Sequence, residues 1–238
     1  MQSKQVDVVE WRSRNKTIKF LPVAHVGQPQ FYQALIDTLR TLKQQGYIVY
    51  YEGVLMERFS DSVSSQLLAP LRQRHLVPAG EALNEDSIAA DVYRRKLRRV
   101  MGVAIDSGGY LQVFQSRGIF RGMVNQPGYK AMGIGRDDVR ADISINELID
   151  VYERSFGAIG LEQIDFAIPL QILSSYPRSR WLPRDQATAV IVHYRDEHLA
   201  SALHASAHQK IVVVYGMAHL KGTWEVLRQL DDSWVKAD

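Results

Sequence analysis

The sequence contains no cysteine, which excludes disulfide bonds, thiolate metal sites and cysteine nucleophiles. It also lacks any run of 18 consecutive apolar residues, so no membrane-spanning helix is expected. The N-terminus, MQSKQVDVVEWRSRNK, has no apolar core of the kind found in secretory signals. These absences predict a protein of the cytoplasm with no membrane span.

Several catalytic signatures are missing as well. There is no Gly-x-Ser-x-Gly motif of a serine hydrolase and no Walker loop. Gly133-Ile134-Gly135 lacks the third glycine of a dinucleotide site. His204 and His208 are four residues apart, but Ala205 stands where a zincin needs glutamate, so a polar helix face is expected there.

Positive charge is not in large excess, since the net charge is +3 over 238 residues. The strongest basic run is Arg94 to Arg99 (RRKLRR), and Tyr93, Leu97 and Val100 form an apolar stripe through it at helical spacing. The arginines are therefore expected mostly on a solvated helix face. No aromatic platform accompanies them, so no nucleic-acid partner is predicted.

Hydrophobic residues make up 46% of the chain and charged residues 23%, which is typical of a folded globular protein. No polar linker divides the chain, which predicts one α/β domain spanning residues 1–238. A helical insertion is expected at approximately 61–133, because residues 61–104 read as mainly helical and 105–133 are rich in glycine. The apolar and aromatic content of the insertion is compatible with a homodimer.

Both ends of the chain predict strands joined by helices. Residues 17–24 and 47–51 read as strands flanking a helix over 30–45, a β-α-β unit whose two strands are expected to pair in parallel. Pro22 suits the end of its strand or an edge position. Near the C-terminus, a helix is expected to start near Arg184 and to precede the continuously apolar strand 210–215. The chain therefore predicts a central, mostly parallel sheet with flanking helices.

Two of the strands are followed by related phrases, PVAH at residues 22–25 and GMAH at residues 216–219. His25, Glu52 and His219 thus fall just past three strand ends, where ligands collect in open parallel sheets. Two imidazoles and a carboxylate suffice to hold a divalent ion with open positions for water and substrate. The alternative is that each is a hydrogen-bonded structural residue and that Glu52 caps a helix or pairs with an arginine.

The resemblance to a known family rests on motifs found in order along nearly the whole chain: PVAHVG, FYQAL, VYYEGV, RADISINEL, LPRDQATAVI and VVVYGMAHLKG. With them the chain resembles the TraB/GumN/Tiki superfamily, which is typified by two Gly-x-x-His motifs, a glutamate ending the second strand and an arginine opening the helix before the last strand. The resemblance implies a catalytic set of His25, Glu52, Arg184 and His219. The sequence departs from the family pattern at Pro22, where glycine is usual.

The resemblance also implies the chemistry, because Tiki-like members are peptidases that depend on divalent metals and related erythromycin-esterase-like enzymes hydrolyse an ester. His25, Glu52 and His219 would be the ligands of Mn, Co or Zn. Arg184 could steady an oxyanion, or it could simply pair on the surface with Asp185 or Asp37.

Two further candidates are Asp142, at the end of another short strand, and Gln126, in the loop VNQPG. Asp142 could equally be a turn carboxylate ahead of Ser144, where Ser144 and Glu147 predict a capping box that opens a helix to about Phe156. The sequence thus predicts a hydrolase, metal-dependent by resemblance, that acts on a peptide or small ester. The alternatives are a metal-free esterase with a histidine base and a binding or signalling module that has kept the fold without the chemistry.

Overall fold

The computed structural model describes residues 6–77, 85–102, 122–170 and 176–237. The chain forms two compact units. The first comprises the described residues within 1–53, 108–142 and 192–238, and the second those within 54–107 and 143–191. This division differs from the predicted insertion at 61–133, because residues 122–133 belong with the first unit and 143–191 with the second.

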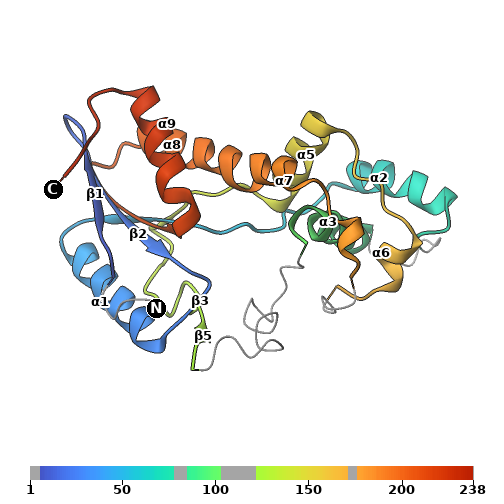
Figure 1. Cartoon of the computed structure of the whole chain (residues 1–238), viewed down its shortest axis with the longest axis horizontal. Helices are drawn as coiled ribbons and strands as arrows, with labels where there is room; N and C mark the ends of the chain where they lie inside the picture. The colour runs from blue at the N-terminus through green and yellow to red at the C-terminus, as the bar shows by residue number, and fades with distance from the viewer. Residues whose placement is uncertain (1–5, 78–84, 103–121, 171–175, 238) are drawn as a thin grey trace. The chain divides into compact units, whose positions relative to one another are not determined.

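The first unit is built on a mixed sheet in the order β6-β4-β7-β2-β1-β8. Figure 1 labels two of its strands, β1 and β2. Its strands are β1 (Val9–Arg12), β2 (Thr17–Val23), β4 (Ile48–Tyr51), β6 (Val139–Arg140), β7 (Lys210–Gly216) and β8 (Val235–Lys236). Strands β6, β4, β7 and β2 run parallel, whereas β1 and β8 are added antiparallel. The α/β class and the mostly parallel sheet are confirmed.

Helices cover both faces of this sheet, with α1 on one side and α8 and α9 on the other (Figure 1). Their bounds are α1 (Pro29–Gln44), α8 (Arg195–Ala205) and α9 (Leu220–Leu230), with the 3-10 turn η3 (Met217–His219) before α9. A separate two-stranded sheet pairs β3 (Val26–Gly27) with β5 (Val124–Asn125).

The prediction that strands 17–24 and 47–51 pair with each other is wrong. Strand β7 lies between them and pairs in parallel with both, so that Val213 faces Phe20 on one side and Tyr50 on the other. The physical reason is burial: the continuous apolar run of β7 needs cover on both faces, and the centre of the sheet supplies it.

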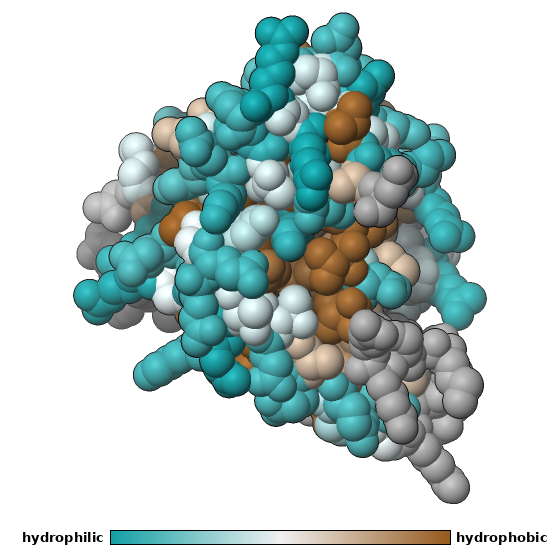
Figure 2. Space-filling view, turned by 90° about the vertical axis from the view of Figure 1, so that its left-hand side faces the viewer, coloured by the Kyte–Doolittle hydropathy of each residue, from teal (hydrophilic) through white to brown (hydrophobic). Residues whose placement is uncertain are grey.

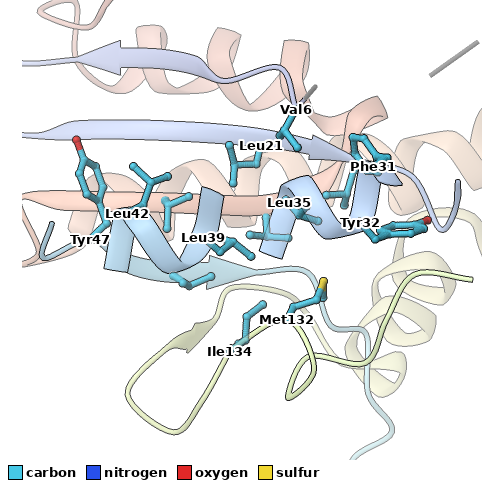
Figure 3. Close-up of a cluster of buried hydrophobic side chains, with 14 residues drawn as sticks. Val6, Leu21, Phe31, Tyr32, Leu35, Leu39, Leu42, Tyr47, Met132 and Ile134 are labelled. Carbon is cyan, nitrogen blue, oxygen red and sulfur yellow. The ribbon is translucent and has the colours of Figure 1, made fainter. Parts of the chain in front are cut away.

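The alternation of side chains along β7 shows how both faces are filled. Val212 and Val214 join the cluster under α1, while Ile211, Val213 and Tyr215 join the cluster under α8 and α9. Figure 3 shows the first cluster, which contains Leu35 and Leu39 of α1 and Leu21 of β2, with Met132 and Ile134 from a later segment below the helix.

Pro22 lies near the end of β2, as its chemistry predicts. The pairing of β1 with β2 ends at Phe20, so the missing N–H of Pro22 interrupts no bond to β1. On the other side Pro22 is level with Tyr215 of β7.

The surface that Figure 2 shows is mostly hydrophilic, with a smaller hydrophobic area near its centre.

The second unit is helical in its described part. It contains α2 (Asp61–Gln73), α3 (Glu85–Met101), α5 (Ile145–Phe156), α6 (Gln163–Ala167), the 3-10 turn η1 (Arg178–Arg180) and α7 (Arg184–Thr188). Helix α5 begins after Ser144 and ends at Phe156, as predicted. The Ser144 side chain caps its start by accepting a hydrogen bond from the Glu147 N–H at 3.0 Å, which is one half of the predicted capping box. The π-helical segment η2 (Ala189–Tyr194) follows α7 and runs directly into α8.

The basic run of α3 does not lie mostly on a solvated face, as was expected. Arg94 is exposed, but Arg98 is fully buried and Lys96 is 8% exposed. Arg98 donates to the main-chain carbonyls of Asp165, Ile168 and Pro169. The run holds the end of α6 in place, a tertiary role that charge patterning alone does not reveal.

No helix in the described ranges is long and apolar enough to cross a membrane.

Candidate functional site

The carboxyl edge of the sheet in the first unit is organised around Arg195, the first residue of α8. Its guanidinium is 6% exposed and forms a two-point contact with Asp142, from Nε to Oδ1 at 2.9 Å and from Nη2 to Oδ2 at 2.8 Å. Asp142 follows β6, and its Oδ2 also accepts the N–H of Gly53 at 2.9 Å. Arg195 thereby joins helix α8 to the end of β6.

Glu52 follows β4 and is held at both carboxylate oxygens. Its Oε1 accepts a hydrogen bond from Arg195 Nη2 at 2.6 Å, and its Oε2 accepts the N–H of Gly216 at 2.7 Å. A Cβ at position 216 would lie 3.1 Å from Oε2, closer than a normal contact. The glycine of the GMAH phrase therefore lets the main chain approach Glu52 this closely without shifting its carboxylate.

His219 is 4% exposed, and both of its ring nitrogens have protein partners. Nδ1 lies 2.7 Å from Asp196 Oδ1, and Nε2 lies 3.2 Å from Arg195 Nη1. Because a guanidinium only donates, Nε2 must accept, and the ring proton belongs on Nδ1, where it is donated to Asp196. Arg195 and Asp196, neighbours in sequence, thus fix the tautomer of His219 together.

Asp196 is itself confined by α9. A Cβ on Gly222 would lie 1.8 Å from Asp196 Oδ2, so only glycine leaves space for this carboxylate. The close approach of Asp196 explains why helix α9 contains Gly222, although glycine is otherwise unfavourable inside a helix.

The charges in this network support each other. Burial alone would raise the pKa of Asp142, but the hydrogen bonds and charge of Arg195 outweigh it and the pKa is lowered. Burial would likewise lower the pKa of Arg195, yet the hydrogen bond to Asp142 and the surrounding acidic groups raise it. Tyr215, whose ring lies under the guanidinium with 5.4 Å between Arg195 Cζ and the ring centroid, has its pKa raised by burial.

His25 and Gln126 belong to the same edge but to a different environment. His25 is exposed and lies two residues beyond Val23, the residue of β2 that is level with Gly216. Its carbonyl accepts the N–H of Gln126 at 2.8 Å, which fixes the loop after β5 to the first histidine phrase. The two phrases therefore share a sheet edge, with His25 exposed and His219 buried.

The residues do not fit the predicted metal ion in this arrangement. The described part of the chain contains no group of three or more histidine, aspartate or glutamate residues placed to hold a metal. Two of the proposed ligands, Glu52 and His219, instead direct a side-chain acceptor at the guanidinium of Arg195. Arg195 thus lies between two of the three residues predicted as ligands.

Arg184 lies in the second unit, exposed at the start of α7. Asp37, one of its suggested surface partners, pairs with Arg40 at 2.8 Å. Arg195 is the arginine that contacts Glu52 and His219, and sequence reasoning missed it. The available indication was its spacing, because Arg195, Leu199 and Leu203 follow each other at four-residue intervals and so share the buried face of α8.

His204 and His208, the other histidine pair, do not lie on one helix. Helix α8 ends at Ala205, so His204 is on the helix and His208 is beyond it. His208 Nδ1 lies 3.2 Å from the Tyr50 hydroxyl. His204 lines a polar pocket of about 320 Å³ with Lys16 and Asp231, on the amino-terminal side of β2 and β7.

Comparison of the chain with protein-family models, with curated proteins and with solved structures finds no match. The resemblance to the TraB/GumN/Tiki superfamily stays a prediction that rests on the quoted motifs.

Proposed function

We propose that the chain is a hydrolase of peptide or ester bonds that acts at the carboxyl edge of the sheet without a catalytic metal ion. The observation that supports this proposal best is the placement of Glu52. Its carboxylate is held at 2.6 and 2.7 Å by Arg195 and Gly216, yet its side chain remains 13% exposed. A carboxylate held in one geometry at an open strand edge is suited to orienting a water molecule or a base.

His25 is the general base in this proposal. The His219 Nε2 would have to give up its hydrogen bond from Arg195 to accept a proton, whereas His25 is exposed on the same edge. His25 takes a proton from water as the water oxygen bonds to the substrate carbonyl carbon. The same proton then passes to the leaving alkoxide or amine as its bond to that carbon breaks. Glu52 orients the water.

The test is hydrolysis of an activated ester, p-nitrophenyl acetate, and of a fluorogenic peptide library, each in the presence of EDTA. His25→Gln and Glu52→Gln should each lower kcat/KM by about 100-fold or more, because general-base catalysis contributes roughly 10²–10⁴. His204→Gln, an exposed histidine on α8, is the matched control and should stay near the wild-type rate. Wild-type activity that EDTA abolishes and Mn²⁺ restores would favour the metal-dependent mechanism instead.

A non-catalytic binding module is the second candidate. Arg195 forms hydrogen bonds to Asp142, Glu52 and His219 of its own chain. A purely structural arginine would form the same bonds, and this favours the second candidate. No turnover of any ester or peptide by folded wild-type protein would support this second function over the first.

A further inference from the structure

We infer that Met217 forms an apolar subsite beside the proposed catalytic groups, and that the substrate carries an apolar group on the acyl side of the bond that is cleaved. The inference rests on the proposed hydrolysis, because it names the substrate class of the same site. It begins with the position of Met217, which is the first residue of η3 and directly follows strand β7.

Strand β7 ends between the two strands that supply the proposed catalytic groups. Its neighbours in the sheet are β4, which is followed by Glu52, and β2, which is followed two residues later by His25. The last residue of β2, Val23, is level with Gly216, the last residue of β7. Because adjacent strands lie about 4.8 Å apart, Met217 follows a strand end that is one strand spacing from each of the other two.

The turn that carries Met217 is anchored at both ends. Before it, the N–H of Gly216 donates to Glu52 Oε2 at 2.7 Å. At its other end His219 is 4% exposed and contacts Asp196. A 3-10 turn has three residues per turn, so residues two apart lie on different faces, and with His219 buried the Met217 side chain faces solvent. Met217 is 57% exposed, the highest value among the large hydrophobic side chains exposed in the described ranges.

The place of Met217 distinguishes it from other exposed apolar side chains, which are ordinary on a protein surface. It puts apolar surface between a carboxylate, Glu52, and an imidazole, His25. The methionine side chain is unbranched and polarisable, and it adapts to apolar groups of different shape. Contact with such a group removes apolar surface from water on both partners, which favours binding.

The proposed proton transfers decide which part of the substrate contacts Met217. His25 protonates the leaving alkoxide or amine, so the leaving group lies beside His25, after β2. The other substituent of the carbonyl carbon extends away from His25, toward the end of β7. This substituent is the acyl chain of an ester or, in a peptide, the residue that supplies the carbonyl, and in either case it is apolar.

The first experiment measures kcat/KM for p-nitrophenyl acetate and p-nitrophenyl hexanoate, each corrected for hydrolysis without protein. Wild type should prefer hexanoate by about 10-fold or more, because apolar contact of even one methylene contributes roughly 10–200-fold in a pocket. Met217→Gln, similar in length but polar, should lower the hexanoate-to-acetate ratio by about 5-fold or more, whereas Met217→Leu should retain it. Leu230→Gln, 45% exposed at the far end of α9, is the matched control and should keep the wild-type ratio. The p-nitroanilides of acetyl-leucine and acetyl-glycine give the corresponding ratio for amides.

A second experiment detects the subsite without turnover. Protein labelled with [methyl-¹³C]methionine is titrated with hexanamide and with acetamide, which present a carbonyl with and without an apolar chain. The Met217 methyl resonance is identified by its loss in Met217→Leu. Hexanamide should shift this resonance saturably, and acetamide at the same concentrations should not.

The two experiments separate failure of the subsite from failure of the proposed hydrolysis. Ester turnover with a hexanoate-to-acetate ratio near 1, or with a ratio that Met217→Gln leaves unchanged, would overturn the subsite and leave the hydrolysis intact. A saturable hexanamide shift without turnover of any ester or anilide would keep Met217 as an apolar binding site and overturn the hydrolysis. Neither turnover nor a shift would overturn both.

Discussion

Each unit contains a buried arginine that lies over a tyrosine ring, and the two arginines do different things. Arg98 in the second unit lies over Tyr176 at 4.0 Å and donates to main-chain carbonyls. Arg195 in the first unit lies over Tyr215 at 5.4 Å and donates to side chains that carry or can gain charge.

The pKa values of the two arginines differ for this reason. Burial lowers the pKa of Arg98, because Tyr176 and Asp165 compensate only part of the lost hydration and Arg95 adds a like charge. The carboxylates around Arg195 outweigh burial and raise its pKa. Arg98 holds main chain in place, whereas Arg195 fixes the orientation of two carboxylates and an imidazole at the edge of the sheet.

The largest expected effect on stability tests the role of Arg98 in holding main chain. Arg98→Ala removes three hydrogen bonds to main-chain carbonyls, of which those of Asp165 and Ile168 also accept from Arg95. At about 1.5–3 kcal/mol for each bond from a charged donor, the free energy of unfolding should fall by about 3 kcal/mol or more. Urea unfolding followed by circular dichroism measures it. Arg94→Ala, the exposed neighbour on α3, should change stability by less than about 0.5 kcal/mol. Equal effects of the two variants would remove the structural role of Arg98.

The next largest effect tests the contact between Arg195 and the carboxylate of Asp142. Asp142→Asn removes a charge that accepts two bonds from Arg195 and should cost about 2–3 kcal/mol at neutral pH. The pKa of Asp142 is lower in the folded state than in the unfolded chain. Its contribution is therefore fully present above the unfolded pKa, near 4, and is lost as pH falls through the folded value.

Urea titrations at pH 7 and at pH 3 or below, on wild type and Asp142→Asn, measure this dependence. The difference between the two proteins should shrink as the pH falls. A difference that stays constant across this range would show that the charge of Asp142 does not carry the effect.

A smaller effect tests the packing behind His219. Alanine is normally favoured over glycine inside a helix, but Gly222→Ala puts a methyl group 1.8 Å from Asp196 Oδ2 and should cost about 1–3 kcal/mol. The chemical shifts of the His219 ring nitrogens should move with it, because Asp196 is displaced. Gly128→Ala, where a Cβ meets nothing within 4 Å, is the control and should leave both measurements near wild type.

The smallest effect compares the two tyrosines. Tyr176→Phe removes a hydroxyl that donates to Asp165, and Tyr215→Phe removes one that hydrogen-bonds to Asp142. Each should cost about 1–2 kcal/mol in urea unfolding. Only Tyr215→Phe should reduce the destabilisation caused by Asp142→Asn when the two changes are combined, because the Tyr215 hydroxyl hydrogen-bonds to Asp142. The same reduction by Tyr176→Phe would contradict the distinction between the two clusters.

Much of the fold was predictable, and the reasons are local. Helix α1, strand β7 and the Ser144 start of α5 follow from apolar periodicity, a continuous apolar run and a capping residue, each of which acts within a few residues. The order of the strands was not predictable in this way, because which strand lies beside β7 depends on burial summed over the whole sheet.

The candidate site, like the fold, was predictable from the sequence only where short-range pattern determines it. The sequence by itself determined that His25, Glu52 and His219 follow strand ends, since strands and their ends are set by short-range pattern. Only the tertiary structure decided that Glu52 and His219 meet Arg195, and that Asp142, some 53 residues before it in the chain, completes the contact. Partners so far apart are chosen by packing α8 onto the sheet, where a buried guanidinium is stable only beside carboxylates.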